Sequence, residues 1–509
     1  MARATYVFEV DWDNDKDYAD TGEDLTARTF RLDWVRGRDY ASQLTGKSIG
    51  SRLTAIIDNT SGDYNSLNGT GPLSGKILPG RRVRLRSTAP VAATLWTGRL
   101  ENINPHPQIG AVNVVELNAI GPLAYVNLNK VSIALQSDIA TGAAIDAILD
   151  EISWDAADRA VDSGQTLMAK FEVDVIPVVD ALRQVEETEA GFITESRDGK
   201  IVFEDRHHRL KGSHLVSQGT FSDSVNAEVT YRDINQVDPL PHIFNRFEAT
   251  VNRYKADTGG TVVLWTLAQG DTESPVIRFG ETRDFWALYP GPSSPAGSHS
   301  VDTWTTPVAT TDYLTNSQAD GLGTNLTSSM AISVKKQSRR MKISVTNNHA
   351  TLSAFLTFLQ ARGTGNTKEE PFVISSEDTG SQAAYGVRLW PVPALWISQE
   401  ESARNYILFL MRIYGQPLPI EYITVLGHRD TNHLGEVLVR DISERVTLYA
   451  TSDRTGLGVT SEMFIENEHH TITRNREHTV TYGLSPLDGY SGFTVMDTAL
   501  LGQDSALAY

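Results

Sequence analysis

Residues 191–203 read Gly191-Phe192-Ile193-Thr194-Glu195-Ser196-Arg197-Asp198-Gly199-Lys200-Ile201-Val202-Phe203. Two short runs rich in apolar residues flank Asp198-Gly199, a dipeptide that accommodates the positive φ values of a tight hairpin turn. This is the strongest hairpin signal in the chain. We expect two antiparallel strands here, joined at Asp198-Gly199.

The residues before this hairpin have a different period. Ile145, Ile148, Leu149 and Ile152 follow helical spacing. A second helical pattern, Val178, Leu182 and Val185, follows Pro177, which is favoured where a helix begins because the N–H groups there have no partner. Together with the hairpin, these segments predict a small α+β domain over residues 126–210.

Residues 1–125 read as β. Six short alternating runs are separated by turn residues, which is typical of a barrel or a sandwich. The runs are Tyr6–Val10, Thr29–Val35, Arg52–Ile57, Arg82–Arg86, Thr94–Leu100 and Val112–Ala119.

C-terminal to the hairpin, β-rich sequence returns in residues 211–255 and 391–490, around an inserted β-rich domain at 256–390. Within the insertion, a Thr/Ser/Asn-rich passage over 302–330 predicts an exposed loop. Ser398-Gln399-Glu400-Glu401 has the spacing of a capping box ahead of a helix. Residues 491–509 are expected to form a C-terminal arm that docks on a neighbour.

The amino-acid composition limits the classes of protein to which this chain can belong. The 509 residues are 40% hydrophobic and 21% charged, enough to build packed cores, and they include no cysteine. Disulfides and Cys-based zinc sites are therefore excluded. The formal net charge of −18 argues against general nucleic-acid binding. We expect no secretory signal and no membrane-spanning segment, because the N-terminus enters a strand-like run directly and no apolar stretch reaches about 18 residues.

Several phrases resemble one known family. Phe8 to Asp15, Arg36-Gly37-Arg38-Asp39-Tyr40, Leu78-Pro79-Gly80-Arg81 and Trp96-Thr97-Gly98 are similar to the N-terminal domain of siphophage minor tail proteins, the tail-tip or baseplate-hub family. The hairpin and its continuation to Arg206 resemble the second domain of that family. The similarity continues through Asn347-Asn348, Gln360-Ala361-Arg362-Gly363, Arg440-Asp441-Ile442 and Leu484-Ser485-Pro486, and so covers most of the chain.

The resemblance implies a mainly β, multi-domain structural virion protein and not an enzyme. It implies two tail-tube-like β-barrels per subunit, one in 1–125 and one in 211–255 with 391–490. A homotrimer would then present six barrels, so a threefold tip could join and close a sixfold tube. The implied partners are distal-tail and tail-tube proteins, the tape-measure protein, fibre or spike proteins and, transiently, genomic DNA. The implied location is the distal end of a phage tail, assembled in the host cytoplasm.

Two alternatives stay open. A tail-associated cell-wall hydrolase would need a catalytic motif, and the sequence has no Gly-x-Ser-x-Gly elbow, no phosphate-binding loop and no cysteine nucleophile. A receptor-binding protein would need a face for host-surface glycans. Aromatic residues of the insertion could stack on sugar rings, although aromatic residues more often pack in cores. They are Trp265, Trp286, Tyr289, Trp304 and Tyr313.

One acidic loop has the ligand spacing of a calcium site. Its candidate ligands are Asp11, Asp13, Asp15, Asp17 and Glu23, with oxygen donors at alternate positions and an acidic residue near the twelfth. Lys16 stands where such loops place glycine for the sharp turn. The alternative is a solvated acidic turn between two strands. A bound calcium ion would brace the turn and would take no part in catalysis.

Other clusters favour structural interpretations. His207-His208 and His469-His470 are adjacent pairs that we expect on strands, where neighbouring side chains point to opposite faces, so we expect surface or interface histidines and no zinc site. Glu186, Glu187 and Glu189 predict a charged helix face rather than an acid–base pair. No cofactor is expected apart from the calcium ion.

Overall fold

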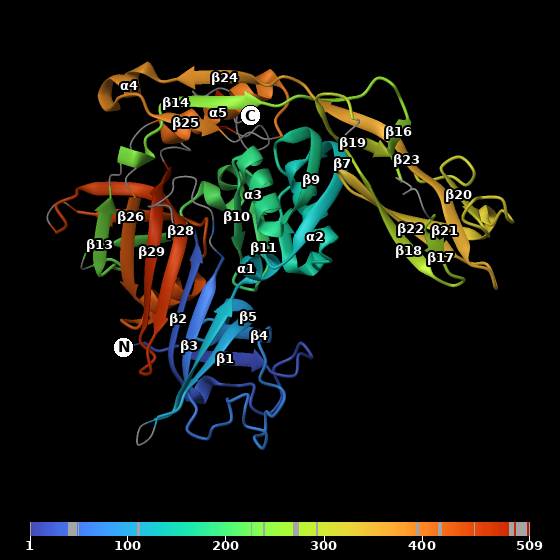
Figure 1. Ribbon diagram of the computed structural model, residues 1–509. Coiled ribbons are helices and arrows are strands. Elements are labelled where there is room, and N and C mark those ends of the chain that lie inside the picture. The colour runs from blue at the N-terminus through green and yellow to red at the C-terminus, as the bar shows by residue number, and fades with distance from the viewer. Residues whose placement is uncertain are drawn as a thin grey trace.

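The computed structural model describes residues 2–38, 48, 50–108, 112–224, 226–237, 240–267, 274–291, 294–392, 396–415, 420–451, 454–487, 493–494 and 506–507. Asp39 and Tyr40 lie outside this set. So does most of the predicted arm 491–509, of which β30 (Phe493–Thr494) and β31 (Ala506–Leu507) are described as a parallel pair. The chain is mainly β and divides into several sheets, as predicted (Figure 1).

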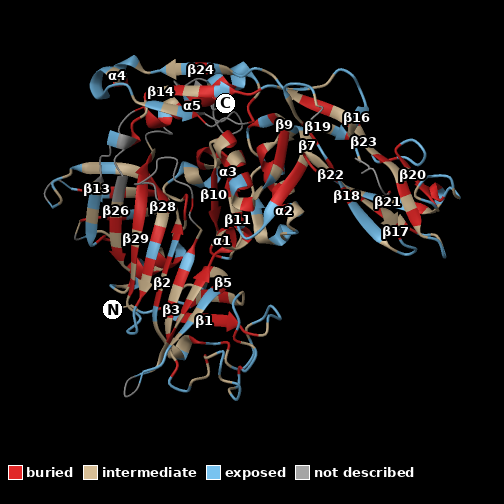
Figure 2. Cartoon of the chain, in the orientation of Figure 1, coloured by how far each residue is buried: buried red, intermediate tan, exposed pale blue. Residues whose placement is uncertain are grey.

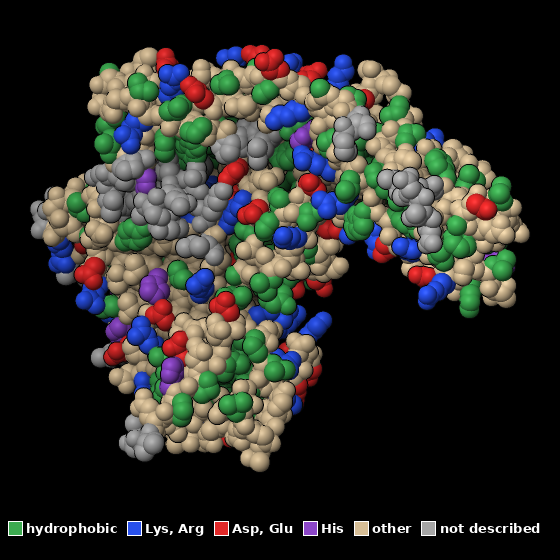
Figure 3. All heavy atoms as spheres, viewed as in Figure 1, with side chains coloured by type: hydrophobic (Ala, Val, Ile, Leu, Met, Phe, Trp, Pro, Cys, Tyr) green, Lys and Arg blue, Asp and Glu red, His purple; other side chains and the backbone are tan. Residues whose placement is uncertain are grey.

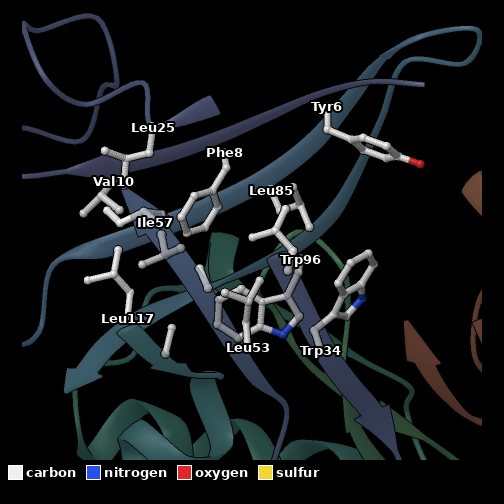
Figure 4. Close-up of a cluster of buried hydrophobic side chains, with 14 of the residues drawn as sticks. Tyr6, Phe8, Val10, Leu25, Trp34, Leu53, Ile57, Leu85, Trp96 and Leu117 are labelled. Atoms are coloured by element: carbon white, nitrogen blue, oxygen red, sulfur yellow. The ribbon is translucent and has the colours of Figure 1, made fainter. Parts of the chain in front are cut away.

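The six N-terminal strands surround one core. All neighbours pair antiparallel in the order β1-β4-β5-β6-β3-β2. Inward side chains alternate with outward ones, and Phe8, Trp34, Ile57 and Trp96 converge in the centre (Figure 4). The predicted strand runs are confirmed as β1 (Thr5–Asp11), β2 (Thr29–Gly37), β3 (Arg52–Asp58), β4 (Arg82–Ala89), β5 (Ala93–His106) and β6 (Val114–Ile120).

The sheet does not end at β2. Strand β2 pairs antiparallel with β28 (Val459–Ile472), in a register running from Leu32 opposite Ile472 to Gly37 opposite Asn467. The N-terminal and C-terminal β-units thus form one sheet of 12 strands. We call the β2–β28 pairing the seam. Beyond it lie β29 (His478–Pro486), β26 (Ile420–Leu426), β13 (Asp233–Val237), β27 (Arg445–Ala450), β12 (Gly219–Ser222) and helix α6 (Thr431–Val439).

The mixed unit lies beside the seam. Its hairpin β10 (Phe192–Glu195) and β11 (Ile201–Glu204) is confirmed, with Gly199 at a φ of 83° in the turn. Helices α2 (Thr141–Glu151) and α3 (Val178–Glu189) pack on it, and α3 begins directly after Pro177, as predicted. The remaining elements are α1 (Pro122–Val126), β7 (Lys130–Ala140), β8 (Arg159–Val161) and β9 (Leu167–Pro177).

The insertion projects as an arm from one end of the molecule (Figure 1). Its long central strand β23 (Ala354–Lys368) pairs with β15, β16, β17, β19 and β20, and a separate sheet has the order β18-β22-β21. The passage 302–330 is not the exposed loop we predicted, because β20 runs through it and Tyr313 and Thr315 are buried. The other strands are β15 (Tyr254–Ala256), β16 (Val262–Thr266), β17 (Val276–Ile277), β18 (Thr282–Leu288), β19 (Ser298–Trp304), β20 (Tyr313–Asn316), β21 (Met330–Lys336) and β22 (Arg340–Asn347).

A further layer covers the other end of the mixed unit. Strands β24 (Phe372–Glu377), β14 (Arg246–Val251) and β25 (Leu389–Val392) form a sheet with its own core against helix α5 (Glu400–Tyr414), and α4 (Thr379–Tyr385) follows β24. The capping-box prediction was wrong, because the residue before α5 is Gln399 and no side chain caps the helix. The predicted domain boundaries stay a prediction. No described helix is long and apolar enough to span a bilayer.

Candidate functional site

The acidic loop at the end of β1 closes on Asp11. The buried Asp11 carboxylate accepts hydrogen bonds from the backbone N–H of Asn14 at 2.5 Å and of Lys16 at 3.1 Å. Asn14 and Lys16 both have positive φ, 67° and 78°. Lys16 therefore takes the left-handed conformation that glycine provides in calcium loops, and the sharp turn forms without glycine.

Three of the five predicted calcium ligands come together. One carboxylate oxygen from each of Asp11, Asp13 and Asp15 lies within 4.8 Å of the others. Asp17 and Glu23 are outside this group and accept backbone hydrogen bonds instead, Asp17 from Ala19 and Glu23 from Trp12 and Asp20.

Lys76 would compete with a metal ion for the carboxylate of Asp13. Lys76 Nζ lies 3.0 Å from Asp13 Oδ2 and, through that contact, lowers the pKa of Asp13. A metal ion bound at this loop would have three carboxylate ligands from the protein. It would lie close to the positively charged Lys76.

Within the part of the chain that the structure describes, no histidine belongs to a group of side chains close enough to share a metal ion. Among the described residues, the group Asp11, Asp13 and Asp15 is the only one with metal-ligating atoms close enough to share an ion. His207 and His208 lie in a turn and a short 3-10 helix, not on a strand as predicted. Burial lowers the pKa of His207 to about 4, which keeps its imidazole neutral.

His469 and His470 point to opposite faces of β28, as predicted, but His470 and His478 are not surface residues. Both are fully buried at the seam. The Tyr6 hydroxyl lies 2.8 Å from His478 Nδ1, His478 Nε2 lies 2.9 Å from His470 Nδ1, and Trp34 stacks on His470. Burial holds the pKa of His478 well below its ordinary value, and the neighbouring His470 adds to this.

The glutamates of α3 do not form the charged solvent face that we predicted. Glu186 and Glu189 are buried. Glu186 receives the backbone N–H of Ile193 at 2.6 Å and pairs with Arg183. Glu189 receives the backbone N–H groups of two residues ahead of β9 and the hydroxyl of Thr141. These carboxylates are engaged in holding backbone amides, so they do not form an acid–base pair.

The seam carries a buried ionic cluster that sequence reasoning missed. Arg36 on β2 lies directly opposite Glu468 on β28, and its Nε donates to Glu468 Oε1 at 2.8 Å. Arg197, from the hairpin, donates to the other Glu468 oxygen at 3.1 Å. Burial alone would raise the pKa of Glu468, but Arg36 and Arg197 outweigh it and hold that pKa well below its ordinary value.

The hairpin also makes contacts that join three units. Glu195 accepts the backbone N–H of Ser51 and of Leu123, each at 2.6 Å, while its carbonyl accepts from Arg36 at 3.0 Å. Arg197 donates to the carbonyl of Leu438 at 2.6 Å. The hairpin is thus fixed to the N-terminal strands on one side and to the C-terminal β-unit on the other.

A second ionic cluster lies next to the first. Glu466 binds Arg38 and Arg209, each with a shortest N–O distance of 2.6 Å, and accepts the Ser485 hydroxyl at 2.5 Å. Glu466 and Glu468 are two residues apart on β28, and Arg38 follows directly after β2, two residues beyond Arg36. The spacing of these charges is visible in the sequence, but by itself it shows neither that they are buried nor which strands pair.

The aromatic residues predicted to bind glycans do not share one surface. Tyr289, Trp304 and Tyr313 are buried in the core of the insertion, and Trp265 is half-buried against that core. Trp286, with 45% exposure, is the one exposed member of the five. Figure 2 shows the exposed positions along β18 in pale blue.

Several ion pairs join the insertion to the mixed unit. His299 lies 3.0 Å from Glu172, Arg340 lies 3.1 Å from Asp174, and Lys170 pairs with Asp302. A further pair joins Lys335 to Glu151 at 2.5 Å. Both signs of charge are interspersed on the visible face near this junction (Figure 3).

The fold places the chain in a class: a cysteine-free, mainly β, multi-domain protein in which two β-units share one sheet. No protein-family model matches it, and no curated protein does. Among solved structures it is similar to a tail protein from Neisseria meningitidis MC58, with 10% identity, a TM-score of 0.49 and coverage of 94% of this chain and 96% of that one.

A 43 kDa tail protein of prophage MuSo2 from Shewanella oneidensis is similar at 9% identity and a TM-score of 0.48, over 95% and 99% of the two chains. A prophage tail protein, gp18, from Listeria monocytogenes EGD-e has 6% identity and a TM-score of 0.40, over 94% of each chain. At these TM-scores the similarity does not by itself indicate a function for this chain.

Proposed function

We propose that this protein is a structural subunit at the distal end of a phage-type tail, where it joins the tail tube to the tip. The observation that carries the proposal is the seam. Two β-units lie edge to edge in one 12-stranded sheet, and buried ion pairs fix their relative position. A subunit that presents two tube-like units side by side needs such a rigid connection.

The sequence resemblance implies how the subunits would assemble. Three copies, each with two β-units, would form a ring of six that matches a sixfold tube, and a closed ring is what cyclic symmetry favours. The insertion is held at the periphery by ion pairs, which suits an attachment point for fibre or spike proteins. The distal-tail, tail-tube and tape-measure proteins are the proposed partners above and inside the ring.

The proposed role does not include catalysis. Glu186 and Glu189, the carboxylates most suited to acid–base chemistry by sequence, are committed to backbone amides and arginine. A host-glycan role for the insertion has only Trp286 as an exposed aromatic platform among the five predicted residues. We therefore favour the structural role over the hydrolase and the receptor binder.

The test is the solution mass of the purified protein, followed by negative-stain images with and without tail tubes. A trimeric ring that caps tubes is the expected result. A stable monomer that ignores tubes but binds or cleaves cell-wall glycans would contradict the proposal.

We also propose that the acidic loop binds calcium through Asp11, Asp13 and Asp15. The ion would brace the turn between β1 and the following segment. It is a structural site, and tube binding does not depend on it.

A further inference from the structure

A cavity of about 210 Å³ lies at one end of the seam, between β1, β2 and the turn that joins β28 to β29. Its walls include the buried apolar side chains of Phe8, Leu32 and Ile472. In the described sheet, β1 pairs with β4, whereas β2 pairs with β3 and β28. Strands β1 and β2 are therefore not hydrogen-bonded to each other, and the turn lies at the opening between them.

Strand β2 is irregular beside this cavity. The register between β2 and β3 shifts between Thr29 and Arg31, so that Phe30 forms a bulge, and the Phe30 ring lines the cavity. Arg474, in the turn, places its guanidinium carbon 4.4 Å from the centre of that ring. An arginine held over a ring face can still donate two N–H groups to one carboxylate. The ring thus orients Arg474 without using its capacity to bind an anion.

A second arginine of the same turn, Arg476, also lines the cavity. Its φ of 59° lies in the left-handed region, which glycine and asparagine adopt at lower cost. The backbone N–H of Arg476 donates to the carbonyl of Thr473, and the N–H of Thr473 donates to the carbonyl of Glu477. These bonds hold the turn closed with both arginines at the mouth of the cavity.

Neither arginine of the turn forms an ion pair with a carboxylate of the described residues. The two arginines at the start of β2 do: Arg28 lies 3.3 Å from Asp63, and Arg31 lies 3.1 Å from Asp33. The chain has 63 acidic and 45 basic residues, so two neighbouring arginines without a carboxylate run against its overall charge. The mouth of the cavity therefore complements an acidic group.

We propose that this cavity, which we call the arginine pocket, binds an acidic segment of a partner protein. One Asp or Glu carboxylate of the partner lies between Arg474 and Arg476, and a neighbouring apolar side chain packs against Phe8, Leu32 and Ile472. The volume suits one such side chain, because an apolar cavity of about 150 Å³ holds one benzene molecule.

A nucleic acid or an anionic membrane fits the arginine pocket less well. Each presents many phosphates, which a chain with a net charge of −18 repels at long range, and the pocket offers two cations and not a track of them. The proposal does not rest on the tail-tip function, because it concerns the chemistry of the occupant and not its origin.

The first experiment titrates the full chain with the capped peptide acetyl-Leu-Glu-Leu-amide, whose one charge is the glutamate carboxylate. The readout is the NMR chemical shift of the Ile472 δ1 methyl group in isoleucine-labelled protein, because Ile472 lines the pocket. We expect a saturable shift. The uncharged peptide acetyl-Leu-Gln-Leu-amide should bind at least about tenfold more weakly, since it cannot form charge-assisted hydrogen bonds with the arginines.

The second experiment repeats the titration with the double variant Arg474→Gln, Arg476→Gln, which should bind the Glu peptide at least about tenfold more weakly than the wild-type protein. The matched control is Arg31→Gln, an exposed arginine of β2 that already pairs with Asp33 and does not line the pocket, and it should bind normally. Thermal unfolding checks that each variant is folded.

The double variant Arg474→Lys, Arg476→Lys keeps both charges and decides the question if the Gln variant does not fold. It should still lose affinity severalfold, because lysine lacks the planar fork that binds a carboxylate through two hydrogen bonds.

Four results would overturn the proposal. Equal affinity for the Glu and Gln peptides would indicate an apolar cavity alone, and an equal loss in Arg31→Gln would indicate a general effect of charge. Saturable binding of phenyl phosphate without binding of the Glu peptide would assign the pocket to a phosphate ligand. No saturable shift at about 10 mM Glu peptide would show that the pocket does not bind a carboxylate.

Discussion

At the scale of single residues, the notable feature of the seam is a small set of buried charged side chains. Glu468 is fully buried between Arg36 and Arg197, and Glu466 between Arg38 and Arg209. A buried ion pair adds little net stability compared with a well-packed apolar pair, but removing one partner leaves an uncompensated charge in the interior. We therefore expect substitution of any single member of these clusters to destabilise the seam.

We expect Glu468→Gln to lower the free energy of unfolding by about 3 kcal/mol, because the buried Arg36 and Arg197 lose one of the two carboxylates that they face and keep only Asp441. Denaturant unfolding at pH 7 measures this. The matched control is Asp33→Asn on the exposed face of the same seam, where Asp33 contacts His469, and it should cost less than about 1 kcal/mol. Equal effects of the two substitutions would contradict the role assigned to the buried charge.

Stability should fall as the pH drops below about 6.5. His470 and His478 have folded-state pKa values below their ordinary 6.5, so the unfolded chain binds protons first and the stabilisation present above pH 6.5 is lost on acidification. Glu466 and Glu468 have depressed pKa values, so a further loss begins below about 4.5. His478→Gln should reduce the slope between pH 6.5 and 5 by up to about 1.4 kcal/mol per pH unit, measured by denaturant unfolding across pH. An unchanged slope would exclude His478 as a titrating group.

At the scale of elements, two local structures are held together by charged side chains near the surface. The loop after β1 gathers three carboxylates, and the insertion is held on β9 and α2 by ion pairs. Each arrangement is exposed enough to be changed by solution conditions, unlike the seam.

Calcium should raise the melting temperature of the intact protein if the acidic loop binds it. Saturation at about 100 times the dissociation constant corresponds to about 2.7 kcal/mol. Asp15→Asn should abolish most of this increase, since Asp15 belongs to the carboxylate group. Asp17→Asn is the control, because Asp17 lies outside the group, and it should retain the increase. No shift of the wild-type protein at about 5 mM calcium, or an equal loss in both variants, would rule out this site.

Charge reversal at the base of the insertion should loosen it. Lys170→Glu sets a carboxylate against Asp302, so limited proteolysis near β15 and β19 should accelerate severalfold, and Asp302→Lys in the same chain should restore resistance. Raising the salt concentration should act in the same direction but weakly, because the Lys170–Asp302 pair is only partly exposed to screening ions. Failure of the double reversal to restore resistance would show that the pair does not hold the insertion.

At the scale of the whole molecule, sequence predicted local structure better than long-range contacts. The hairpin at 192–204, helix α3 after Pro177 and the six N-terminal strands follow from period and turn residues. The seam joins residues more than 400 positions apart, and no local pattern encodes that pairing. Its charged residues alternate along strands, a pattern that normally indicates a solvent face, so the buried clusters went unrecognised.

The candidate sites also divide into those set by local sequence, which could be predicted, and those set by contacts between distant residues, which could not. Three of five calcium ligands come together because neighbouring residues in one loop are constrained to be close. Glu186 and Glu189 are buried against other elements of the mixed unit, and His470 and His478 contact Tyr6 and Trp34 of the N-terminal strands. The capping box failed for a local reason, since the helix begins at Glu400 without a side-chain cap.

The seam also bears on how this molecule would respond to mechanical force. Because β2 and β28 are antiparallel with a register of six residue pairs, a pull along the strands loads the ladder in shear, so its hydrogen bonds must fail together. A pull across the strands would open them one after another at much lower force. The two β-units should thus resist separation along the strand direction and yield in the perpendicular direction.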